Sequence, residues 1–265
     1  MLDLPCCDGE PWEGVDLNFD KLAGLAAAAI RAEERPVTVI AHDWGAYVAS
    51  IVLTEHPELI ERLVLLDVGA FSLRWSNPKG LLTGLGIVCY QGINILIYLL
   101  GRSRWRPLRR LANAINGVWA PALCAASGSW DDYGRVTSSN VNHFYANFVS
   151  RFARSEGHKR MVATLRSPPA PLLFLYGSGW FHDPQWESAL RSAEWPECDA
   201  AFIERGHWFF RTFEGRALTA STIIRWMGGD QQPPSNHRLR RQTIAMEILW
   251  GPKFGPTFSH GRFRG

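Results

Sequence analysis

Asp43 is the residue of this sequence best placed for covalent chemistry. It is the centre of Ala-His-Asp-Trp-Gly, residues 41–45, which follows a β-branched run and precedes an apolar series with helical spacing. A sharp strand-to-helix turn of this kind needs small residues two positions before and after its centre, here Ala41 and Gly45. A carboxylate, with an ordinary pKa of about 3.9, is ionised at neutral pH and can attack a saturated carbon without a base. The pattern therefore predicts an Asp nucleophile that forms an alkyl ester.

Further apolar runs predict the sheet that holds this turn. Leu63 to Gly69 and Pro171 to Gly177 are continuous apolar stretches, as expected of strands buried on both faces. Strands that alternate with helices indicate a parallel sheet with right-handed crossovers. Residues 71–169 are too many for a loop and contain helical patches. We expect an α/β core made of residues 1–70 and 170–228, with residues 71–169 inserted as a helical cap.

The turn resembles that of the α/β-hydrolases, and within them that of the epoxide hydrolases and haloalkane dehalogenases, which usually reads Gly-His-Asp-Trp-Gly-Gly. Residues 42–45 match it, and alanines replace the outer glycines. Residues 3–5, Asp-Leu-Pro, are similar to a segment that precedes the turn in these proteins, although Cys6 replaces its first glycine. The resemblance runs from about residue 3 to 227. It implies a mostly parallel α/β-hydrolase sheet with a helical cap and no metal or organic cofactor.

The resemblance also implies a late histidine that activates water to hydrolyse the ester. His207, in Arg-Gly-His-Trp at 205–208, is the one of eight histidines in the right place. The backbone N–H of Trp44, the residue after the nucleophile, would help to hold the oxyanion.

Two carboxylates compete for the role of orienting the His207 imidazole. The family commonly places this acid three residues after the glycine that ends the preceding strand, which is Gly177, but Trp180 stands there. Asp183 comes three residues later and precedes His207 by 24 residues. Some dehalogenases carry the acid after the strand that follows the turn, where Asp67 lies. We favour Asp183 and keep Asp67 as the alternative.

The cap separates the two reactions. Epoxide opening needs a hydrogen-bond donor for the ring oxygen. Epoxide hydrolases resemble one another in two cap tyrosines, to which Tyr90 in a Tyr-Gln step and Tyr145 in Asn-His-Phe-Tyr-Ala-Asn are similar. A dehalogenase needs a halide cradle of N–H groups, for which Trp44 has no diagnostic partner. Epoxide hydrolysis ranks ahead of dehalogenation, and the apolar cap favours a small apolar substrate.

Both ends of the chain depart from the family. Only 35 residues precede Pro36, so the usual early strands and the His-Gly turn that provides a second oxyanion N–H have no counterpart. We expect an N-terminally truncated fold whose sheet begins at an unpaired edge. The chain would then be a fragment of a longer hydrolase, a short hydrolase, or a non-catalytic remnant that binds.

Residues 229–265 are expected to be a poorly ordered basic tail that completes no element. They hold six Lys or Arg and two Asp or Glu, which leaves 22 basic and 23 acidic residues in the rest of the chain. A body of this charge gives no indication of nucleic-acid binding.

The predictions of cellular compartment and of membrane contact rest on less specific patterns. Five cysteines without a Cys-x-x-Cys pair suggest neither a disulfide framework nor a zinc cluster, and the N-terminus does not read as a signal peptide. We expect a cytoplasmic protein; the oligomeric state is not predicted. Leu81 to Leu100 is uncharged, long enough to span a membrane and followed by arginines, but Gln91, Asn94 and three glycines favour a buried or cap helix.

Overall fold

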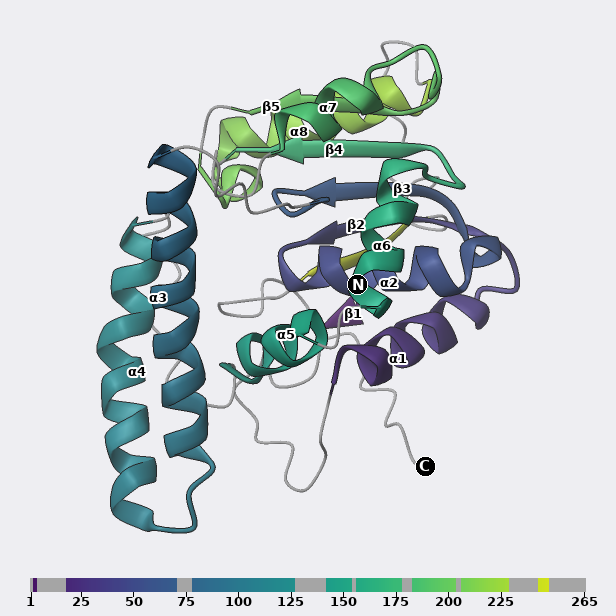
Figure 1. The fold of residues 1–265 in the computed structure, drawn as a ribbon. Helices are drawn as coiled ribbons and strands as arrows, with labels where there is room; N and C mark the ends of the chain where they lie inside the picture. Colours follow the sequence, from purple (N-terminus) through teal and green to yellow (C-terminus); the bar gives the residue numbers. More distant parts are fainter. Residues whose placement is uncertain are drawn as a thin grey trace.

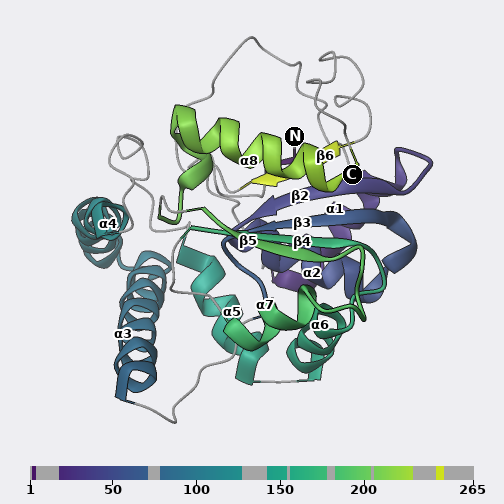
Figure 2. The ribbon, with the colours of Figure 1, turned by 90° about the horizontal axis from the view of Figure 1, so that it is seen from above.

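The computed structural model describes residues 2–3, 18–70, 78–126, 142–153, 156–177, 183–203, 206–228 and 243–247. They form one six-stranded sheet, in which every pair of neighbouring strands is parallel, with helices on both faces (Figures 1 and 2). The strand order is β1-β6-β2-β3-β4-β5. The strands are β1 (Leu2–Asp3), β2 (Val37–His42), β3 (Ile60–Leu66), β4 (Leu172–Tyr176), β5 (Asp199–Phe202) and β6 (Thr243–Glu247). The predicted α/β class is confirmed.

The helices divide between the core and the cap. Core helices are α1 (Phe19–Arg31), α2 (Trp44–Glu55), α6 (Glu156–Arg166), α7 (Pro184–Leu190) and α8 (Phe213–Trp226). Helix α6 falls within residues 71–169, which we expected to form the cap, but it packs against α2 and α7. Three helices stand beside the end of the sheet that carries Asp43, namely α3 (Pro78–Gly101), α4 (Arg106–Ala126) and α5 (His143–Ala153) (Figure 1). None of the helices in the described part of the chain combines the length and the apolar character that a membrane crossing requires.

Alternation along β3 and β4 divides the core between the two faces of the sheet. Leu63 and Leu65 pack on the side of α1 and α2, whereas Val64 and Leu66 pack with Ile223 of α8. All four β3 side chains are at most 5% exposed. Burial on both faces explains why these strands read as continuous apolar runs.

Strand β6 corrects the expectation that the segment after residue 229 completes no element. Residues 243–247 lie between β1 and β2, and Val39 of β2 pairs with Ile244. Strand β2, which leads into the sharp turn at Asp43 (the elbow), is therefore paired on both sides, by β6 and by β3. It is not the unpaired edge that we expected. Local pattern could not reveal this, because the pairing joins segments about two hundred residues apart. The rest of the tail lies outside the described residues.

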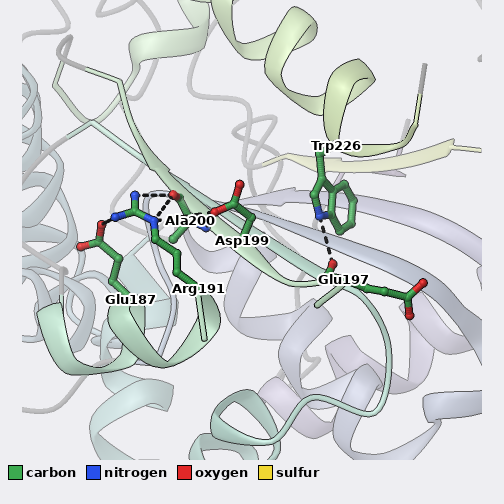
Figure 3. A network of polar contacts seen from close by, with 6 residues as sticks. All are labelled: Glu187, Arg191, Glu197, Asp199, Ala200 and Trp226. Atoms are coloured by element: carbon green, nitrogen blue, oxygen red, sulfur yellow. Dashed lines mark hydrogen bonds and ion pairs between the residues drawn. The ribbon is translucent and has the colours of Figure 1, made fainter. Parts of the chain in front are cut away.

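Arg191 ties edge strand β5 to helix α7 (Figure 3). Its guanidinium donates to the carbonyl oxygen of Ala200 and forms an ion pair with Glu187 at 2.6 Å. The indole N–H of Trp226, at the end of α8, donates to the carbonyl oxygen of Glu197 at 3.0 Å. These contacts fix β5, the strand after which the chain continues to His207.

Candidate active site

Asp43 occupies the sharp turn between β2 and α2. Its backbone has φ 52° and ψ −122°, a strained conformation for a residue other than glycine. Ala41 and Ala46 beside it are at most 1% exposed, so larger side chains would not fit. Asp43 precedes the first residue of α2, yet its carboxylate accepts no bond from the first turn. The turn thus holds a carboxylate that is not used as a helix cap.

His207 lies next to Asp67 at the carboxyl end of the sheet. Nδ1 of His207 is 2.5 Å from Oδ2 of Asp67, and the other Asp67 oxygen accepts from the backbone N–H of Gly177 at 2.7 Å. Asp67 follows β3, is 1% exposed and has φ 62°. A buried carboxylate bonded on both oxygens holds the imidazole in one orientation and directs Nε2 away from Asp67.

Asp183, which we preferred as the acid that orients His207, caps helix α7. It precedes α7, and its Oδ1 accepts from the backbone N–H of Gln185 at 3.0 Å, with Pro184 at the first helical position. The carboxylate next to the His207 imidazole is that of Asp67, so the preference for Asp183 is wrong. An Asp followed by Pro is a typical helix start, and this pattern could have warned against the assignment.

The remaining nitrogen of His207 faces the elbow carboxylate. Nε2 is 3.9 Å from Oδ2 of Asp43, too far for a direct hydrogen bond. Burial lowers the pKa of His207, but the hydrogen bond to Asp67 and the negative charges of Asp43 and Asp67 outweigh this effect and raise the pKa to about 10. The imidazole is therefore a cation at neutral pH.

Replacing Asp43 with Asn is expected to lower the pKa of His207 from about 10. The substitution removes one of the two negative charges that stabilise the imidazolium and leaves burial unchanged. Imidazole ¹⁵N chemical shifts followed by NMR from pH 5 to 11 measure the change. Asp183→Asn is the control and should leave the titration in place; an unaltered His207 titration in Asp43→Asn would contradict the predicted coupling.

His42 supports the loop that carries His207, a role that the sequence analysis missed. Its Nε2 is 3.3 Å from the carbonyl oxygen of His207, and its ring lies 4.6 Å from the His207 ring and 4.5 Å from that of Trp208. His42 is 1% exposed. A polar residue inside a buried strand, next to Asp43, is the signal that could have indicated it.

The two cap tyrosines meet at the elbow. The rings of Tyr90 on α3 and Tyr145 on α5 lie 5.5 Å apart, and Tyr145 lies 5.1 Å from the indole of Trp44. Burial and then the charge of Asp43 raise the pKa of Tyr90 above its usual value, against opposing hydrogen bonds from Tyr145 and Gln91. The Tyr90 phenol therefore stays protonated at neutral pH and can donate. Trp44 begins α2, so its backbone N–H has no partner within the helix.

The other predicted features are less informative. Within the described ranges, no cluster of three or more His, Cys, Asp or Glu side chains could hold a metal ion. Of the five cysteines, Cys89 and Cys198 are described, and both are free thiols. Residues 4–6 and Trp180 lie outside the described residues.

Comparisons with known proteins establish the family of the chain. Residues 1–222 match the alpha/beta hydrolase family, and the chain belongs to it. A curated relative, the cis-3-alkyl-4-alkyloxetan-2-one decarboxylase of Shewanella oneidensis, is 38% identical over 64 residues. The match spans 22% of this chain and about a fifth of the relative.

Solved structures show the same fold. A variant of haloalkane dehalogenase DatA from Agrobacterium tumefaciens has a TM-score of 0.52 at 10% identity, covering 81% of this chain and 75% of its own. A candidate epoxide hydrolase from Pseudomonas aeruginosa has a TM-score of 0.50 at 14% identity, covering 82% and 75%. At these identities the likeness extends to the fold alone.

Proposed function

We propose that this α/β-hydrolase opens epoxides through an ester on Asp43. One observation carries the proposal: Asp67, His207 and Asp43 lie in series, and the cap tyrosines Tyr90 and Tyr145 adjoin the elbow. This arrangement provides a nucleophile, a base with its orienting acid, and donors for a leaving oxygen. The structures of similar fold include a candidate epoxide hydrolase and a haloalkane dehalogenase, and the two tyrosines favour epoxide hydrolysis.

In the first step an Asp43 oxygen attacks an epoxide carbon as the C–O bond of the ring breaks. The ring oxygen takes a proton from Tyr90 or Tyr145, which gives a hydroxyalkyl ester and a tyrosinate. Ester formation removes the negative charge of Asp43. The pKa of His207 therefore falls, and the imidazolium releases its proton to solvent, which leaves a neutral imidazole that can act as a base. Once Asp43 is again a carboxylate, His207 regains a proton from solvent.

In the second step His207 takes a proton from water, and the resulting hydroxide attacks the ester carbonyl carbon. The backbone N–H of Trp44 stabilises the oxyanion. When the tetrahedral intermediate collapses, the leaving alkoxide takes the proton from His207 and the diol departs. Asp43 is left as a carboxylic acid, whose proton returns to the tyrosinate. The sum is one epoxide and one water converted to one diol.

His207→Ala should trap the ester in a folded protein. Without the base, the first step proceeds and the second stalls, so intact mass spectrometry should show an increase equal to the epoxide mass, mapping to Asp43 after digestion. An Asp43→Ala, His207→Ala double variant is the control and should gain no mass. A folded His207→Ala protein that gains no mass with any of a panel of epoxides and haloalkanes would contradict covalent carboxylate catalysis.

Adding an alkyl oxetan-2-one to this panel tests a second candidate, opening of an oxetan-2-one ring, which the partial match to the oxetanone decarboxylase favours. Such a ring is also strained and presents carbons that a carboxylate can attack. Turnover of an alkyl oxetan-2-one with loss of CO₂, and none of the epoxides, would favour this candidate.

Tyr90→Phe and Tyr145→Phe are each expected to lower kcat for epoxides by about 10²-fold, because alkoxide departure needs a proton donor. Turnover of a haloalkane, whose halide leaves without a proton, should change by less than about fivefold. The ratio of the two rates in each variant is the measurement. Tyr98→Phe, on the same helix, is the matched control, because its hydroxyl accepts from Arg102 near the end of α3.

A further inference from the structure

Helix α3 carries an exposed apolar stripe on the side away from its packed face. At about 100° per residue its members fall in one narrow sector, opposite the side that packs inward. The stripe consists of Leu85, Val88, Leu96 and Leu99, each between 54% and 58% exposed. The buried positions opposite are Ile87, Gln91, Asn94 and Ile97. Helix α4 adds a second stripe of Leu111, Ile115 and Val118, which are 50%, 36% and 74% exposed.

In contrast to these exposed apolar stripes, several polar side chains of the cap helices lie on the packed side. The amide of Asn94 donates to the carbonyl oxygen of Tyr90 and accepts from the indole N–H of Trp119. The amide of Asn142, before α5, donates to that of Asn116 at 2.8 Å. Amides bonded inside and leucines outside are the reverse of the usual surface helix, and exposed apolar faces of this extent mark interaction sites.

The charge of the hairpin formed by α3 and α4 indicates which kind of surface its apolar stripes bind. Residues 78–126 contain Lys79 and five arginines but no Asp or Glu. The arginines gather at the turn between the helices, at the end of the hairpin away from the sheet (Figure 1). They are Arg102, Arg104, Arg106, Arg109 and Arg110, all exposed. Among them stands Trp105, 64% exposed. Leu99 lies within one helical turn of the end of α3, and Leu111 lies within two turns of the start of α4.

We propose that the α3–α4 hairpin docks on the surface of an anionic phospholipid bilayer. Tryptophan and leucine side chains would enter the interfacial region, while the arginines pair with lipid phosphates. A second copy of this chain is a poorer occupant. Pairing two hairpins face to face would bring together twelve basic residues without one carboxylate on either. The docked cap would present the elbow side of the enzyme to apolar molecules dissolved in the membrane.

Vesicle flotation of the full chain tests the proposal without reference to catalysis. We expect binding to vesicles of phosphatidylcholine and phosphatidylglycerol at 3:1, with at least tenfold weaker binding to phosphatidylcholine alone and a decrease in high salt. Arg104→Gln with Arg106→Gln should weaken binding about 30-fold, at about tenfold or less per charge removed. Leu99→Ser with Trp105→Ser should reduce it at least tenfold.

Matched controls separate docking from folding and from general charge. Arg160→Gln with Arg225→Gln removes two exposed charges from core helices, and Leu218→Ser with Phe213→Ser removes two exposed apolar side chains from α8. Both should float like the parent, and thermal unfolding should confirm that every variant is folded. Absence of binding to the anionic vesicles, or equal flotation by hairpin and control variants, would overturn the proposal. So would sedimentation that shows a dimer dissociated by the hairpin substitutions.

Discussion

Asp67→Asn is expected to lower kcat about 10⁴-fold for whichever substrate the enzyme turns over. The Asn amide can replace one oxygen in shape but not in charge, so it neither stabilises the imidazolium nor fixes the ring tautomer that presents Nε2 to the elbow. Because Asp67 also accepts from the N–H of Gly177, the substitution disturbs the loop that precedes His207. KM should change less than kcat, since Asp67 is buried beneath the imidazole.

Asp183→Asn is the discriminating comparison for this prediction. Asparagine is as good a helix N-cap as aspartate, so the bond to the N–H of Gln185 can persist and α7 should keep its stability. We expect kcat within about threefold of the parent. Steady-state rates of the two variants, with circular dichroism as the check of folding, decide the matter. A larger loss of kcat in Asp183→Asn than in Asp67→Asn would restore Asp183, the acid that we preferred from the sequence.

Strand order explains why Asp43 was easier to single out from the sequence than the carboxylate that lies beside His207. The elbow is a local pattern, since a β-branched run, small residues and an apolar helix lie within twenty residues of Asp43. The acid depends on which strand ends meet. Asp67 follows β3, which lies between β2 and β4, so the carboxyl ends of three neighbouring strands bring it beside both Asp43 and Gly177.

Other features depended on contacts that no local pattern encodes. The indicators for His207 were its late position and the Gly-His pair, but its support by His42 joins residues 165 positions apart. The cap tyrosines lie 55 positions apart and were recognised separately; their ring contact follows from the packing of α3 against α5. Strand β6 shows the same limit for the fold, because five residues with weak local signal complete the sheet beside β2.

Asp43→Gly should abolish turnover and yet stabilise the protein. Loss of the nucleophile leaves no route to the ester, and we expect at least a 10⁴-fold decrease in kcat. Asp43 is held at φ 52°, where a residue with a Cβ is strained by about 1–3 kcal/mol, and glycine relieves most of this. The greater freedom of glycine in the unfolded chain offsets part of the gain, by up to about 1 kcal/mol. Chemical denaturation should therefore show an increase of about 1 kcal/mol in the free energy of unfolding.

Glu34 provides the matched control for the strain argument. It also has a positive φ, 56°, but lies in the exposed turn between α1 and β2, away from the elbow. Glu34→Gly should increase stability by a similar amount, about 1 kcal/mol, and leave kcat unchanged. If both variants gain stability and only Asp43→Gly loses activity, the strain at the elbow is retained for the position of its carboxylate. A decrease in stability of Asp43→Gly would instead mean that the carboxylate, through the charged His207, contributes more to folding than its backbone strain removes.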